Sequence, residues 1–193
     1  MDLSKYEGII FDMDGTLVDS MPSHIEAWRL TCLHYGYPFD LDYMWSLGGV
    51  PTIETVTLLN AKYQLARDEE EVAKTKNLLW KQLNLTPSLI NVTYDIFQQY
   101  LGVLPMGIGT GAERSHALEL LQHHGLFNKI NVLVTATDVT NGKPHPETFL
   151  SAADKMKINP TKCIVFEDTK IGAIAAQRAG MDCILVKNGQ LIL

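Results

Sequence analysis

Residues 8–17 read GIIFDMDGTL, and this stretch decides the fold. The apolar run 8–11 predicts a short buried strand. Asp12 and Asp14 follow it at the C-terminal end of that strand, where open α/β sheets bind their ligands. Two acids this close at a buried strand end repel each other unless a cation neutralises them. We therefore expect a functional site here.

A pair of aspartates separated by one residue also opens calcium-binding loops. Such a loop needs a third oxygen ligand, then Gly at its sixth position and a bidentate Glu at its twelfth. Counted from Asp12, Gly15 occupies the fourth position and Ser23 the twelfth. The spacing excludes the calcium loop.

Outward from this stretch, short apolar runs alternate with helical patterns. Gly125 and Gly180 each follow an apolar stripe of helical spacing, as a helix C-cap does. Alternation of strands and helices predicts a doubly wound parallel α/β sheet covered on both faces. The four further predicted strands are 103–108, 132–135, 163–166 and 183–186.

One region interrupts the alternation, because residues 18–87 show helical stripes and no convincing strand. We expect an α/β core made of residues 1–17 and 88–193, with a helical cap, residues 18–87, inserted between the first two strands. Trp28, Trp45 and Trp80 all fall inside the insertion and are expected to form its core.

The composition is that of an ordinary globular protein. Of 193 residues, 46% are apolar and 20% are charged, and the net charge is −6. This balance excludes disorder, and the lack of a basic face speaks against a nucleic-acid binder. No apolar signal region or membrane-spanning stretch is visible. Cys32, Cys163 and Cys183 are odd in number and predicted to be buried free thiols, so a cytoplasmic location is expected.

Four segments, in order, resemble the motifs of the haloacid dehalogenase (HAD) superfamily. The resemblance covers nearly the whole chain and is strongest to the β-phosphoglucomutase-like subfamily, particularly to bacterial phosphatases of fructose 1-phosphate and 6-phosphogluconate. It implies a HAD-like Rossmannoid parallel sheet core with an inserted α-helical cap. The four segments are Asp12-Met13-Asp14-Gly15-Thr16, Gly109-Thr110-Gly111, Gly142-Lys143-Pro144 and Phe166-Glu167-Asp168-Thr169.

The two aspartates suit phosphoryl transfer. The Asp12 carboxylate can attack phosphorus and form an aspartyl-phosphate. Asp14 projects to the same side, can protonate the leaving alkoxide, and can then deprotonate the hydrolytic water. These tasks need opposite protonation states, which is a recurring way to divide acid and base between two nearby carboxyls.

The charges predict a metal ion. Asp12, Glu167 and Asp168 together with a phosphomonoester carry several negative charges, against which Lys143 returns only one. Mg²⁺ prefers oxygen ligands and bridges phosphate. The resemblance assigns as ligands the Asp12 carboxylate, the Asp14 backbone carbonyl and Asp168, with Glu167 binding directly or through water.

Other predicted site residues contact the phosphate or the substrate. Thr110 offers a hydroxyl to a phosphate oxygen, and Gly111 lets a backbone N–H approach closely. Lys143 precedes Pro144 and is expected in an extended loop as a catalytic residue. Met13 is assigned to substrate binding as part of the first motif.

The histidines are expected to have different roles. His24 lies one helical turn before Trp28 and matches a cap histidine of the mutase branch, so it is a candidate for assisting Asp14 or the substrate. His34 and His116 are expected on helix surfaces.

These observations predict a Mg²⁺-dependent phosphatase acting on small phosphorylated sugars or sugar acids, such as fructose 1-phosphate or 6-phosphogluconate, through an aspartyl-phosphate. Its expected partner is a small phosphorylated metabolite, with neither nucleic acid nor membrane, and the chain is expected to be a monomer or weak dimer.

Three alternative functions share parts of this pattern. A β-phosphoglucomutase uses the same motifs, but its cap segment carries a Lys and an Arg where this chain has Gly48 and Thr52. A receiver-type phospho-Asp signalling domain has no place for an insertion of about 70 residues. A binding protein with a dead site would not need all the acids and Lys143, which are present.

Overall fold

The computed structural model describes residues 1–192 and divides the chain into two compact units. Met1–Asp19 and Leu89–Leu193 form an α/β unit, and Ser20–Ser88 form a helical unit. The divisions lie within two residues of the predicted ones. A role of the helical unit as a cap stays a prediction.

The α/β unit contains a six-stranded sheet in the order β3-β2-β1-β4-β5-β6. β1 to β5 are parallel, and β6 pairs antiparallel with β5. The predicted α/β class with a parallel sheet is confirmed, while the short β6 was not predicted. The strands are β1 Gly8–Phe11, β2 Met106–Gly109, β3 Val132–Val134, β4 Cys163–Glu167, β5 Asp182–Lys187 and β6 Gln190–Ile192.

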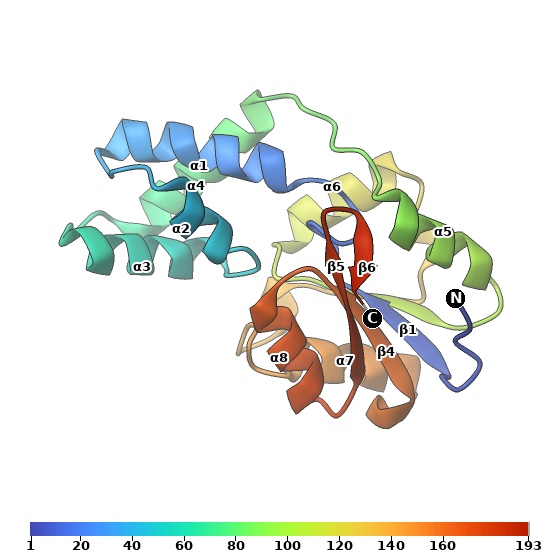
Figure 1. Ribbon diagram of the computed structural model, residues 1–193. Helices are drawn as coiled ribbons and strands as arrows, with labels where there is room; N and C mark the ends of the chain where they lie inside the picture. Colours follow the sequence, from blue (N-terminus) through green and yellow to red (C-terminus); the bar gives the residue numbers. More distant parts are fainter. Residues whose placement is uncertain (193) are drawn as a thin grey trace. The chain divides into compact units, whose positions relative to one another are not determined.

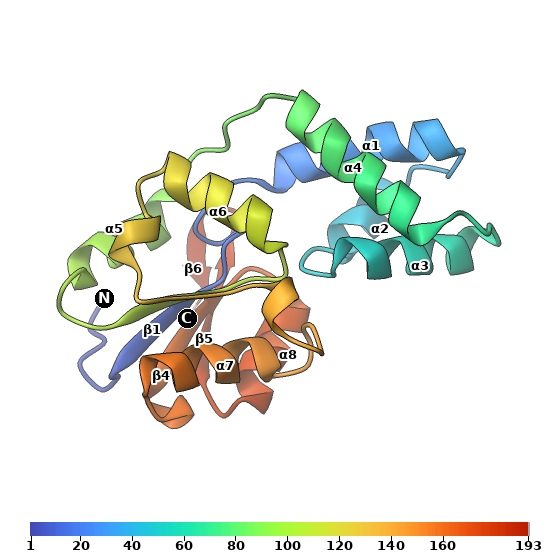
Figure 2. The same ribbon diagram turned by 180° about the vertical axis from the view of Figure 1, so that it is seen from behind.

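Helices cover both faces of this sheet, as Figures 1 and 2 show from opposite sides. α5 (Asn91–Tyr100) and α6 (Arg114–His123) lie on one face. α7 (Glu147–Met156) and α8 (Lys170–Arg178) lie on the other, where they bury Phe149 against the sheet. The 3₁₀ turns η1 (Phe127–Lys129), η2 (Ala136–Asp138) and η3 (Pro160–Lys162) complete the connections.

The second strand begins later than predicted. Residues 103–105 belong to the turn after α5, because the N–H groups of Val103 and Leu104 both donate to the carbonyl of Tyr100. Val103 is 67% exposed, so its apolar character reflects a surface position and not a strand. Cys32 and Cys163 are buried and Cys183 is half-buried, and all three are free thiols.

The helical unit contains α1 (Met21–Tyr35), α2 (Leu41–Ser46), α3 (Thr52–Tyr63) and α4 (Glu69–Gln82). Trp28 and Trp80 are buried as predicted, and the Trp80 indole donates to Ser23 Oγ at 3.0 Å. The prediction for Trp45 is wrong, because this side chain is 47% exposed. α2 spans only six residues, and Met44 occupies its inward position, so the next residue points outward.

Among residues 1–192, no helix has both the length and the apolar character required to span a bilayer.

Candidate active site

The predicted site residues in the α/β unit collect at one edge of the sheet because parallel strands end there together. Asp12 follows β1, and its N–H donates to the carbonyl of Phe166 in β4 at 2.9 Å. Thr110 follows β2, and its N–H donates to the carbonyl of Val134 in β3 at 3.0 Å. The backbone ladder thus continues into the first residue beyond each strand and fixes the positions of these two side chains.

Lys143 joins two of the carboxylates. Its Nζ lies 2.7 Å from Asp12 Oδ1 and 2.7 Å from Glu167 Oε2. The Lys143 and Glu167 side chains are each 1% exposed and that of Asp12 is 7% exposed. Charged groups buried this deeply persist only when paired and hydrogen-bonded. Sequence reasoning placed Lys143 in the site, and the structure brings it to the nucleophile candidate.

Glu167 is held by α8 as well as by Lys143. Its Oε1 accepts from the N–H and the hydroxyl of Thr169 at 2.9 and 2.6 Å. Its side chain also packs on Gly172, where an added Cβ would lie 2.0 Å from Glu167 Cδ. Gly172 therefore shapes the site although it carries no chemistry of its own, and the sequence motifs did not single it out.

Asp168 completes a cluster of three carboxylates. Asp12, Glu167 and Asp168 each offer an oxygen, and these atoms lie within 4.8 Å of one another. Thr16 donates from its hydroxyl to Asp168 Oδ1 at 3.2 Å, which orients that side chain. All the side-chain donors are hard oxygens, so the set fits a hard divalent cation such as Mg²⁺.

The electrostatics indicate the same need for a cation. Burial, and then the charge of Glu167, raise the pKa of Asp12 to about 7. Burial, and then the charges of Asp12 and Glu167, raise the pKa of Asp168 to about 9. Although burial opposes it, the charges of Asp12 and Glu167 raise the pKa of Lys143 above its usual value. The cluster thus holds more negative charge than Lys143 alone offsets, which a divalent cation would compensate.

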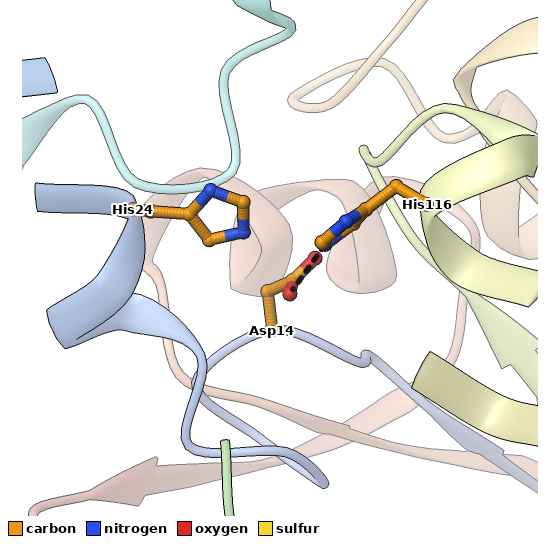
Figure 3. A group of neighbouring side chains, drawn as sticks. All are labelled: Asp14, His24 and His116. Atoms are coloured by element: carbon orange, nitrogen blue, oxygen red, sulfur yellow. Dashed lines mark hydrogen bonds and ion pairs between the residues drawn. The ribbon is translucent and has the colours of Figure 1, made fainter. Parts of the chain in front are cut away.

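Asp14 occupies a different environment from Asp12. Gly15 has φ +82°, and the resulting turn is closed by its N–H, which donates to the carbonyl of Val18. Figure 3 shows Asp14 and His116 pointing toward each other, with His116 Nε2 3.4 Å from Asp14 Oδ1. Their side chains are 17% and 15% exposed. The expectation that His116 is only a helix-surface residue is wrong.

A sequence signal for His116 existed. His116 precedes the buried Leu120 of α6 by four residues, so the two side chains share one face of the helix. That face points inward, and its N-terminal end reaches Asp14.

His24, the third residue drawn in Figure 3, belongs to α1 of the helical unit. Its Nδ1 lies 2.9 Å from Nζ of the buried Lys76, and its ring stacks on Trp80. Its predicted contact with the substrate or with Asp14 stays a prediction.

The residues predicted to contact the phosphate or the substrate differ in how far they are buried. Thr110 is buried, and its hydroxyl oxygen accepts the N–H of Ala112 at 3.0 Å, which leaves the hydroxyl hydrogen to donate elsewhere. Gly111 is half-buried in the following loop. Met13 is fully buried, so its predicted contact with the substrate stays a prediction.

Comparison with known proteins agrees with this geometry. The family model described as haloacid dehalogenase-like hydrolase matches residues 9–186. The chain belongs to this family. The predicted resemblance is therefore confirmed for a HAD-like hydrolase.

Individual relatives match over nearly their whole length. An uncharacterised protein of Haemophilus influenzae is 39% identical over 98% of this chain and 95% of its own. The fructose-1-phosphate phosphatase YqaB of Escherichia coli is 38% identical over 95% of this chain and 97% of its own. A crystal structure of β-phosphoglucomutase from Clostridium difficile has a TM-score of 0.82 and 26% identity, and it covers 95% of this chain and 85% of that one. The family and its phosphatase members bear out the predicted phosphatase enzyme of the HAD family.

Proposed function

We propose that this HAD hydrolase is a Mg²⁺-dependent phosphatase that hydrolyses small phosphorylated sugars or sugar acids through an aspartyl-phosphate on Asp12. The observation that carries the proposal is the buried Asp12 carboxylate, which Lys143 holds at 2.7 Å at a strand end. A carboxylate held in this way is oriented and shielded from bulk water, and Lys143 together with a bound cation would favour its ionised form, as a nucleophile needs.

In the first half-reaction, an Asp12 carboxylate oxygen attacks phosphorus, and an O–P bond to Asp12 forms while the bond from phosphorus to the sugar oxygen breaks. Asp14 gives its proton to that sugar oxygen, so the sugar leaves as an alcohol and Asp14 becomes a carboxylate. Thr110 donates its hydroxyl hydrogen to a phosphoryl oxygen.

In the second half-reaction, water attacks the phosphorus of phospho-Asp12. Asp14 takes a proton from the water as the new O–P bond forms and the bond to Asp12 breaks. Inorganic phosphate leaves, and both aspartates return to their starting protonation states. Lys143 offsets the charge of the Asp12 carboxylate before and after the cycle.

Asp12, Asp168 and the backbone carbonyl of Asp14 would hold the magnesium ion, which supplies charge neutralisation for the transferring phosphoryl group. We assign Glu167 to contact through water and to positioning. Both its oxygens are already engaged, Oε1 by Thr169 and Oε2 by Lys143.

The substrate class is supported by the relative YqaB, whose name gives fructose 1-phosphate. The rival function is that of β-phosphoglucomutase, favoured by the solved structure from Clostridium difficile. A mutase must hold a second phosphate while the intermediate reorients. In the segment of the helical unit where mutases carry an Arg, this chain has Thr52, and Arg29 is occupied by Glu26 through two hydrogen bonds of 2.7 and 2.8 Å. A neutral threonine lacks the charged, bidentate grip of arginine.

Two assays test the proposal. Purified protein given fructose 1-phosphate and Mg²⁺ should release phosphate, and an excess of EDTA should stop the release until Mg²⁺ is restored. β-Glucose 1-phosphate with a trace of glucose 1,6-bisphosphate should give mostly free phosphate. Stoichiometric conversion to glucose 6-phosphate with little phosphate would replace the hydrolase by the mutase. Phosphate release that EDTA leaves unchanged would contradict the metal requirement.

A further inference from the structure

We propose that His116 is a positioning residue that orients the Asp14 carboxyl for proton transfer to the leaving group. The inference rests on the proposed function, because it concerns the residue that acts there as acid and base. Its basis is the contact of 3.4 Å between His116 Nε2 and Asp14 Oδ1, with both side chains largely buried.

The backbone on the His116 side of this contact is rigidly held. His116 is the third residue of α6, whose first residue, Arg114, donates to both carboxylate oxygens of Asp138 at 2.7 Å. That pair ties the start of α6 to the 3₁₀ turn η2 after β3. Ala117, the residue after His116, is fully buried and fixes the rotation of the helix. His116 therefore approaches Asp14 from a fixed direction.

Asp14 is held at its backbone by the Gly15 turn, but an aspartate side chain retains rotation about two bonds. A donor on one side of the carboxyl selects one orientation. A proton on His116 Nε2 that is donated to Oδ1 leaves the proton of the acid form on Oδ2. A contact of 3.4 Å is at the long end of hydrogen bonds, so it orients the carboxyl without strongly stabilising its ionised form.

Such positioning has a kinetic signature that a purely structural histidine lacks. Acid catalysis matters for a sugar alkoxide, which leaves poorly without a proton, and little for p-nitrophenolate, which is a good leaving group. The kcat/KM value reports transfer of the phosphoryl group to Asp12, before the hydrolysis step that both substrates share. A residue that acts through Asp14 must therefore affect kcat/KM for a sugar phosphate much more than for p-nitrophenyl phosphate.

The variants are chosen to separate hydrogen bonding from packing. His116→Ala removes the ring, His116→Phe keeps an aromatic ring without a donor, and His116→Gln keeps an N–H near the position of Nε2. His123→Ala, in the exposed last turn of the same helix, is the matched control and should change neither substrate's kcat/KM. Thermal unfolding of each variant verifies that it is folded.

We expect His116→Ala and His116→Phe to lower kcat/KM for fructose 1-phosphate by about 10- to 100-fold, the scale of a misplaced catalytic group. The loss with p-nitrophenyl phosphate should be less than about threefold, and His116→Gln should recover most of the activity. In the Asp14→Ala background, His116→Ala should cause no further loss, because the group that it positions is gone.

The outcomes distinguish the acid role of Asp14 from the positioning role of His116. If Asp14→Ala lowers kcat/KM for both substrates equally, the proposed acid role of Asp14 fails, and the positioning role fails with it. If Asp14→Ala is selective for the sugar phosphate but His116→Ala affects both substrates equally, or adds its full effect in the Asp14→Ala background, the proposed function stands and the role of His116 is overturned.

Discussion

Asp12 and Asp14 are separated by one residue, yet they lie in opposite environments. The Asp12 side chain is 7% exposed and is held by a buried lysine at 2.7 Å, whereas Asp14 is 17% exposed and has a long contact to a histidine. A nucleophile benefits from a fixed, ionised and dry carboxylate. A group that gives and takes protons needs access to water and a partner that leaves its proton mobile. The difference teaches that the partner and the water access of a carboxyl, rather than its residue type, support the two roles proposed for these aspartates.

The largest expected effect is at Asp12. Asp12→Asn should lower turnover of fructose 1-phosphate by about 10⁴-fold or more, since an amide cannot form the acyl phosphate. The fold should persist because the volume hardly changes. Asp95→Asn, at an exposed position of α5, is the matched control and should retain activity. Substantial turnover by pure Asp12→Asn protein would remove Asp12 from its role.

Removing Lys143 should disrupt the buried ion pairs that hold the Asp12 carboxylate. Lys143→Met leaves Asp12 and Glu167 buried without their cation, so we expect a loss of about 3 kcal/mol in the free energy of unfolding and of most activity. Urea unfolding and phosphate release measure the two effects. The double variant Lys143→Met with Glu167→Gln should recover part of the stability and none of the activity. Equal stability of Lys143→Met and the parent protein would contradict a tightly paired cluster.

A smaller effect is expected from crowding Glu167. Gly172→Ala would place a methyl group 2.1 Å from Glu167 Oε2, the atom that accepts from Lys143. Overpacking of this kind costs about 1–3 kcal/mol in unfolding free energy. Displacement of Glu167 should also shift Lys143, which donates to it, and so lower activity. Gln177→Ala, exposed on the same helix, serves as the control. Parent-like activity in Gly172→Ala would show that Glu167 tolerates displacement.

The smallest expected effect concerns Asp138, which anchors the helix that carries His116. Burial acts to raise the pKa of Asp138, but hydrogen bonds from Arg114 and Thr135 outweigh burial and lower this pKa to about 2. Since the folded pKa lies below the unfolded value of 3.8, this stabilisation is present above about pH 4 and is lost as the pH falls toward 2. Asp138→Asn should therefore cost about 1–2 kcal/mol at pH 7 in urea unfolding. A stability difference from the parent protein that stays constant down to about pH 3 would contradict this account.

The sequence predicted the site residues whose positions follow from the parallel direction of the strands. Asp12, Thr110 and Glu167 come at or directly after strand ends, and parallel strands place such residues together without further information. The contacts between particular side chains could not be predicted from the sequence. The need for Gly172 arises from how Glu167 folds back over α8, and the contact of His116 arises from the rotation of α6 about its own axis. Trp45 shows the limit of composition, because a tryptophan on a short helix does not have to face inward.

The central claim is that Asp12 carries the phosphoryl group during turnover. It is tested most directly by quenching the Mg²⁺-loaded enzyme with acid during turnover of fructose 1-phosphate, reducing the acyl phosphate with borohydride, and locating the modified residue by peptide mass spectrometry. The account predicts homoserine at position 12 and nowhere else. Modification at Asp14 or Asp168, or steady turnover with no modified residue, would contradict it.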